Sequence, residues 1–206
     1  MSDWLESKGF PRITFVKYQT KQGAVLTLEQ DCLNRSSLPS VAFGFKSCSE
    51  RWKIRPQNKF LSTWDQAVAA WARGDRVTKL VGFDAGEPHR AKDFTDKKYV
   101  VRYPLIEWGM DREDCIAAIR RAGLRPPGKS ACFFCPSSKK WEVSALQKEH
   151  PELYERAVAM ERKARPNVSV AGLGRRWAWE DVPIRAELIA PDSDSQLELP
   201  CGCYDG

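Results

Sequence analysis

Two cysteines separated by two residues are the sharpest chemical signal in the sequence. Cys132 and Cys135 enclose two phenylalanines and are followed by Pro136, which fixes the turn. Two thiolates at this spacing can bind one metal ion or one iron–sulfur cluster; the same pair can also be a redox dithiol or two buried thiols. A redox pair is expected at a helix N-terminus directly after a strand. Because a loop rich in Pro and Gly precedes this pair, the sequence favours metal or cluster ligation.

Five further cysteines bring the total to seven. An odd number without a secretion signal favours metal or thiol chemistry over a disulfide framework. Since zinc or a cubane cluster needs about four ligands, Cys48, Cys201 and Cys203 are candidates to complete the pair. Alternatively, the two tail cysteines deliver a thiol to an active site or have no role. Cys115 lies on an apolar helical face and is predicted to pack, whereas Cys32 receives no role.

A basic segment surrounds Cys48. Four cations lie within ten residues, namely Lys46, Arg51, Lys53 and Arg55. Positive charge favours the thiolate form of a cysteine, which makes Cys48 either a nucleophile or a metal ligand. The same cations can neutralise a phosphate or sulfate group. The alternative interpretation is a solvated basic loop.

Two other groups of polar residues are candidate anion contacts. Asp84, Glu87 and Arg90 lie in a loop at the end of a predicted strand, where Arg90 can bind an anion through two parallel hydrogen bonds. A surface turn joined by ion pairs is the alternative. Lys129 and Ser130 precede the cysteine pair, but the phosphate-binding pattern GxxxxGK[ST] is missing there.

Length and charge restrict the class of protein. The chain has 206 residues and a formal net charge of +6, enough for one domain with a sizeable core. Residues 185–206 carry a net charge of −4, so the preceding 184 residues carry +10, which suits a nucleotide or nucleic acid. No apolar run approaches the roughly 18 residues of a membrane span, and the N-terminus lacks a signal peptide. We therefore expect a cytoplasmic protein without membrane contact.

Strand and helix patterns alternate along the chain. We expect strands at residues 13–18, 78–83 and 99–106, and helices at 63–73, 111–123, 139–149 and 151–165. This order predicts an α/β fold with a mainly parallel sheet flanked by helices, in which ligands bind beyond the carboxyl ends of the strands. We divide the chain into an α/β core, 1–124, and a helical and irregular cysteine-containing region, 125–206.

Several segments resemble the phosphoadenosine phosphosulfate (PAPS) reductase-like family, particularly its short members found in phages and prophages. The resemblance extends from about residue 5 to the end, in family order. The matching stretches are residues 38–56 (LPSVAFGFKSCSERWKIRP), 81–90 (VGFDAGEPHR), 103–115 (YPLIEWGMDREDC), 128–136 (GKSACFFCP) and 200–206 (PCGCYDG).

This resemblance implies a PP-loop fold of the adenine nucleotide alpha-hydrolase-like (HUP-like) type. It also implies sulfur transfer, sulfonucleotide reduction or nucleic-acid thio-modification on an adenine nucleotide, a sulfonucleotide, DNA or RNA. By analogy with iron–sulfur members, Cys48, Cys132 and Cys135 would ligate a [4Fe–4S] cluster or, alternatively, Zn²⁺. Cys203 or Cys201 would be the fourth ligand or a mobile nucleophile.

Two departures from the family shape the expectation. The family's Ser-Gly-Gly-x-Asp-Ser loop is absent, and the tail reads Cys-Gly-Cys-Tyr where PAPS reductases have Cys-Gly-Leu-His. The sequence thus predicts either a protein that no longer binds ATP through this loop or one whose partner chain supplies it. The rival hypothesis is a non-catalytic, zinc- or cluster-stabilised basic module that binds nucleic acid or completes a partner PP-loop enzyme.

Overall fold

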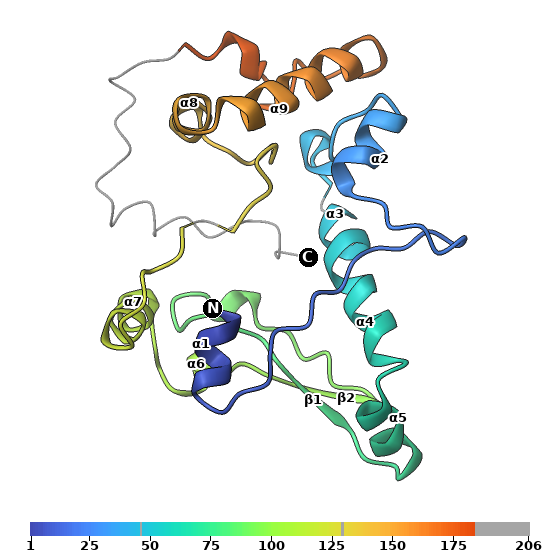
Figure 1. Cartoon of the computed structure of the whole chain (residues 1–206), viewed down its shortest axis with the longest axis vertical. Coiled ribbons are helices and arrows are strands. Elements are labelled where there is room, and N and C mark those ends of the chain that lie inside the picture. The colour runs from blue at the N-terminus through green and yellow to red at the C-terminus, as the bar shows by residue number, and fades with distance from the viewer. Residues whose placement is uncertain (46, 129, 184–206) are drawn as a thin grey trace.

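The computed structural model describes residues 1–45, 47–128 and 130–183, which form a helix-rich chain with one small sheet (Figure 1). Within these ranges no helix combines the length and the apolar character that crossing a membrane requires. The α-helices and strands are α1 (Ser2–Ser7), α2 (Leu28–Asn34), α3 (Ser47–Ser49), α4 (Arg55–Leu61), α5 (Asp65–Ala72), β1 (Val77–Leu80), β2 (Tyr99–Arg102), α6 (Pro104–Glu107), α7 (Arg112–Arg121), α8 (Lys140–Glu149) and α9 (Pro151–Ala164).

The sheet described by the structure consists of β1 and β2, which pair in parallel. Their register runs from Val77 opposite Tyr99 to Leu80 opposite Arg102. Trp71 of α5 packs edge-on against Tyr99 at 5.6 Å between ring centroids and donates its indole N–H to the carbonyl of Lys98 at 2.9 Å. A helix therefore packs against a parallel strand pair, which agrees with the expected α/β class.

The predicted strand at residues 13–18 is wrong, because residues 11–18 adopt no regular secondary structure. Phe15 is 82 % exposed, and the only pairing near this segment is an isolated antiparallel bridge between Gln19 and Val25. The strand predicted at 99–106 stops at Arg102. Pro104 instead occupies the first turn of α6, a position where its missing N–H costs nothing.

The four predicted helices are confirmed as α5, α7, α8 and α9, within a few residues at their ends. Asp111 caps α7: its carboxylate accepts the N–H of Asp114 at 2.9 Å, and the Asp114 carboxylate accepts the N–H of Asp111. Thr63 and Gln66 have the spacing of a capping box, but α5 begins after Trp64 without a side-chain cap.

The hydrophobic core lies among α2, α8, α9 and the segment that follows α9, at the top of Figure 1. It draws on both sides of residue 124, since α2 packs against α9. Thr27 and Gln30 start α2 with a reciprocal capping box. The buried members of this core are Cys32, Leu38, Ala42, Phe134, Val143, Tyr154, Ala157, Val158, Met160, Ala164, Leu173, Trp179 and Val182.

A buried carboxylate organises the chain after α9. Glu161 is 1 % exposed and accepts the backbone N–H groups of Leu173, at 2.6 Å, and Trp179, at 3.1 Å. A Cβ added to Gly172 would lie 2.2 Å from a Glu161 carboxylate oxygen, so only glycine leaves room for the carboxylate. Glu161 thereby fixes the loop that covers the core.

Burial raises the pKa of Glu161 above its usual value, although the hydrogen bonds from Trp179 and Leu173 oppose this shift. The stabilising contribution of a carboxyl with a raised pKa is complete below its unfolded-state value and is lost as pH rises through its folded-state value. We therefore expect the stability advantage of the wild type over E161Q to be larger at pH 4 than at pH 7. Urea unfolding of both proteins at the two pH values measures this difference, and an advantage that grows with pH would contradict it.

Candidate functional site

Cys48 lies at the beginning of a continuous helical run. The run comprises α3, the π-helical turn Glu50–Ile54 and α4, and these elements pack on one another. π-Helical turns are rare and occur frequently at functional sites, because they change which side chains share a face. The Cys48 N–H donates to Ser40 Oγ at 3.1 Å, which ties the start of the run to the 3₁₀ helix Ser40–Phe43.

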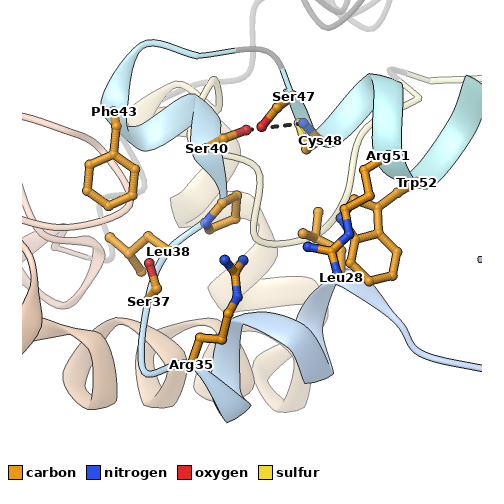
Figure 2. Close-up of a pocket in the computed structure, with 11 residues that line it drawn as sticks. Leu28, Arg35, Ser37, Leu38, Ser40, Phe43, Ser47, Cys48, Arg51 and Trp52 are labelled. Atoms are coloured by element: carbon orange, nitrogen blue, oxygen red, sulfur yellow. Dashed lines mark hydrogen bonds between the residues drawn. The ribbon is translucent and has the colours of Figure 1, made fainter. Parts of the chain in front are cut away.

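A cavity of about 240 Å³ opens beside Cys48. Figure 2 shows the Arg35 side chain reaching from α2 toward Ser40 and Cys48 on the opposite wall, with Arg51 and Trp52 at one side. The cavity thus joins two helical elements and the chain between them. Its lining consists of Leu28, Arg35, Ser37, Leu38, Pro39, Ser40, Phe43, Ser47, Cys48, Arg51 and Trp52.

One buried carboxylate holds both arginines of the cavity. Asp31 is 5 % exposed; it lies 2.5 Å from Arg35 and accepts two hydrogen bonds from Arg51, each at 3.4 Å. The Arg51 guanidinium also lies 5.1 Å from the ring centroid of Tyr18 and 5.0 Å from that of Trp52. One carboxylate against two guanidinium groups leaves a net positive charge at the cavity wall.

Charge and size together define what this cavity can bind. Its lining contains two guanidinium groups, three serine hydroxyls and no acidic side chain. Because 240 Å³ is below the roughly 300–1,000 Å³ of sites that enclose a drug-sized ligand, the cavity suits a sulfate- or phosphate-sized group rather than a whole nucleotide. The Cys48 thiol lies in its wall.

The cysteine pair forms a tight turn on the core. The Cys135 N–H donates to the Cys132 carbonyl at 3.0 Å; Cys135 is buried, whereas Cys132 is exposed. Phe134 belongs to the core, and Phe133 packs against it. The Arg156 guanidinium lies 4.8 Å from the Phe133 ring centroid. The turn therefore presents one thiol to solvent and one to the interior.

Cys32 is the cysteine that the sequence left without a role. Burial raises the pKa of its thiol to about 12, against the positive charge of Arg35, and the charges of Asp31, Cys48 and Cys132 raise it further. Among the residues that the structure describes, no three His, Cys, Asp or Glu side chains are grouped closely enough to hold a metal ion.

The loop after β1 forms its own ion-paired turn. Arg90 pairs with Glu87 at 2.6 Å and lies 4.4 Å from the Phe83 ring centroid, with both charged side chains largely buried. The Asp84 carboxylate accepts the N–H of Gly86 at 2.9 Å. The turn thus brings Asp84, Glu87 and Arg90 close together, with an ion pair between the largely buried side chains of Glu87 and Arg90. Burial, and then the Asp84 charge, raises the pKa of Cys115 beside this loop.

Among the remaining predicted residues that the structure describes, Lys53 and Ser130 are not part of the cavity lining. Lys53 is half-buried in the π-helical turn, and Ser130 is exposed before the cysteine pair. Lys46, Lys129, Cys201 and Cys203 lie outside the described residues.

Sequence reasoning missed the residues supplied by α2 and the chain after it, namely Asp31, Arg35, Ser37 and Ser40. The spacing of Thr27 and Gln30, a capping box, is the signal that would have predicted α2 and placed Asp31 and Arg35 one turn apart.

Comparison with known proteins finds no matching protein-family model, and no curated protein or solved structure with significant similarity to the chain.

Proposed function

We propose that this protein acts in sulfur chemistry on a nucleotide-type substrate, in the manner of the PAPS reductase-like family. The reaction class is sulfur transfer, sulfonucleotide reduction or nucleic-acid thio-modification. The parallel pairing of β1 and β2 supports a PP-loop, HUP-like arrangement in which these strands belong to the nucleotide-binding sheet.

One observation carries this proposal: a thiol shares a small cationic cavity with two arginines. An anionic sulfonyl or phosphoryl group fits the charge and size of the cavity, and the guanidinium forks of Arg35 and Arg51 match its oxygen atoms. Cys48 lines the same cavity, so a bound group would lie next to its sulfur. The anion-binding groups and the Cys48 side chain therefore line one cavity.

The cofactor we propose is a cysteine-ligated [4Fe–4S] cluster, with Zn²⁺ as the alternative. Cys48, Cys132 and Cys135 fit such a group in donor chemistry, because thiolates are the preferred ligands of iron–sulfur clusters and of structural zinc. A cluster would supply electrons or would bind a sulfur atom of the substrate, whereas zinc would stabilise the fold. Ligation requires the side chains to move together, since the described thiols are not grouped at coordination distances.

Replacing Arg51 with methionine tests the anion site. We expect sulfate and adenosine 5′-phosphosulfate to bind the variant at least tenfold more weakly, because a hydrogen bond to a charged group contributes about 1.5–3 kcal/mol. Trp52 lines the cavity, so its fluorescence reports binding directly. Titration calorimetry provides an independent dissociation constant.

Arg55→Met is the matched control. Arg55 lies one turn further along the helical run, is 65 % exposed and pairs with Glu50 at 3.0 Å, outside the cavity lining. The control should bind both anions as the wild type does. Equal affinities of the Arg51 and Arg55 variants, with circular dichroism showing both folded, would contradict the proposal.

A second candidate function, a basic module that binds nucleic acid, is favoured by another cavity. This cavity has a volume of about 450 Å³ and is lined by Lys139, Lys140 and Arg175 together with Trp177. The Lys140 ammonium lies 5.6 Å from the Trp177 ring centroid. Cations beside an indole are a common arrangement for contacting phosphates and bases of single strands.

Salt dependence separates the two functions. A nucleic-acid module should bind a single-stranded oligonucleotide with an affinity that falls steeply with salt, by about 0.7 in log K per log salt for each phosphate contacted. Such a module should not respond to sulfate or to adenosine 5′-phosphosulfate. Loss of oligonucleotide binding in Lys140→Ala together with unchanged anion binding at Trp52 would assign the two cavities to different ligands.

A further inference from the structure

The second cavity, between the turn that leads into α8 and the loop after α9, brings three cationic side chains to one place. We call it the Trp177 cavity, after the indole in its wall. Among the described residues that line it, Lys139, Lys140 and Arg175 are cationic and none is acidic. Two serine hydroxyls lie in the same lining. The cavity therefore favours an anion with more than one negative charge.

The wall formed by the loop after α9 is fixed by contacts with the rest of the protein. The buried Glu161 accepts the N–H groups of Leu173 and Trp179, which flank the lining residues of this loop. A Cβ added to Gly174 would lie 2.2 Å from two atoms of the Trp177 indole, so only glycine lets the ring lie against the backbone. The indole also packs against the core. The ring is therefore held in position.

Arg175 occupies a backbone position that favours glycine. Its φ is +65°, in the left-handed region. Its N–H donates to the Gly172 carbonyl at 2.9 Å and its carbonyl accepts the Ala171 N–H at 3.0 Å, and this turn maintains the conformation. The side chain is exposed and lines the cavity. Since glycine would reduce the strain, the fold does not explain the arginine, whereas an anionic ligand would.

The volume and the indole define the rest of the ligand. The cavity measures about 450 Å³, within the roughly 300–1,000 Å³ of small-molecule sites, so a phosphate group alone would leave most of it empty. The Lys140 ammonium lies 5.6 Å from the Trp177 ring centroid, so positive charge and aromatic surface adjoin. Aromatic side chains stack on nucleic-acid bases whatever the base. A phosphate joined to a planar base fits both features.

We propose that the Trp177 cavity binds one nucleoside 5′-monophosphate unit, either free or at the 5′ end of a single strand. The base stacks on Trp177, and the phosphate lies among Lys139, Lys140 and Arg175. A terminal phosphate carries about 1.5–2 negative charges at neutral pH, against about one for a phosphate within a strand, so three cations favour the terminal group. The inference rests on the second candidate function and deepens it, because it names a single phosphorylated nucleotide as the ligand.

Titration calorimetry with adenosine 5′-monophosphate and with ribose 5-phosphate tests the two contacts separately. We expect the wild type to bind the nucleotide at least fivefold more tightly than the sugar phosphate, because only the nucleotide can stack. Trp177→Leu should abolish this preference and keep the affinity for ribose 5-phosphate. Arg175→Gly should bind both ligands at least tenfold more weakly. It should also remain folded, because glycine suits the backbone at this position.

Arg176→Ala is the matched control. Arg176 is the next residue, is exposed and carries the same charge, but it does not line the cavity. This variant should bind both ligands as the wild type does, and so should Arg51→Met, which alters the other cavity. Loss of nucleotide binding in Arg51→Met with Arg175→Gly unaffected would overturn the inference. Tighter binding of phosphotyrosine than of the nucleotide would overturn it as well.

Oligonucleotides of one sequence, with and without a 5′-phosphate, separate this inference from the nucleic-acid function. We expect the phosphorylated strand to bind more tightly and adenosine 5′-monophosphate to displace it. Equal binding of both strands without displacement by the mononucleotide would overturn the inference and leave the nucleic-acid function intact. Binding of the mononucleotide but of neither strand would support the inference for the free nucleotide and overturn the nucleic-acid function.

Discussion

Replacing Glu161 with alanine should lower the free energy of unfolding by about 3–5 kcal/mol. The substitution leaves the N–H groups of Leu173 and Trp179 without their acceptor in a buried environment, and each unsatisfied group costs about 1–3 kcal/mol. A cavity beside Gly172 adds to this cost. Chemical denaturation at neutral pH measures the change, together with a melting temperature lower by roughly 10 °C.

Glu155→Ala is the control for this prediction. Glu155 lies on the same helix but is exposed, so its replacement should change stability by less than about 0.5 kcal/mol. A loss below about 1 kcal/mol for Glu161→Ala would mean that the loop after α9 does not depend on the carboxylate. The buried Trp179, whose backbone N–H Glu161 accepts, then offers a second readout through its fluorescence.

Replacing Asp31 with asparagine should change binding and stability in opposite directions. The substitution removes the single carboxylate that balances Arg35 and Arg51, so we expect sulfate to bind about tenfold more tightly at low salt. It also weakens the contacts of both guanidinium groups. Because Arg35 and Arg51 are 57 % and 35 % exposed, we expect a stability loss of only about 1–2 kcal/mol.

Because binding and stability should change in opposite directions, the experiment distinguishes an effect on the cavity charge from a general loss of structure. Glu50→Gln is the control, since Glu50 pairs with exposed Arg55 outside the cavity and its loss should leave sulfate affinity unchanged. Added salt should reduce the gain of the Asp31 variant by screening. If the Asp31 variant bound sulfate no better than the wild type, the cavity charge would not control anion binding.

The sequence predicted structure correctly where the interaction responsible joins residues close together in the chain. Asp111 predicts the start of α7 because its carboxylate satisfies an N–H three residues away. The strand expected at residues 13–18 failed because β-branched and aromatic residues form a strand only beside a partner, and the described chain offers Phe15 none. β2 ends at Arg102, and Pro104 lies in the first turn of α6. A proline in the sequence is compatible with both the end of a strand and the start of a helix, so composition alone did not predict α6.

Only the part of the candidate site that comes from the segment around Cys48 could be predicted from the sequence. Cys48 and Arg51 lie within four residues, and their cationic surroundings were visible in the sequence. Arg35 reaches the same cavity because the chain folds back after α2. Hydrophobic periodicity in the sequence does not predict such a change of chain direction. The packing of α2 against α9 joins residues more than one hundred positions apart, as the hydrogen bond from Arg156 to Glu29 does, and no local pattern in the sequence indicates it.

Because α2 and α9 lie far apart in the sequence, the contact between them can form only late in synthesis. Cys132 follows Cys32 by 100 residues in the chain, and ribosomes add about 5–20 residues per second, so the first thiols emerge about 5–20 s before the cysteine turn. Helix α2 gains its partner α9 only later still. During this interval Cys32 lacks the core that buries it. The Cys32 thiol of a nascent chain is therefore most open to oxidation before the second half of the protein has been made, because most of the core that buries it comes from residues 134–182.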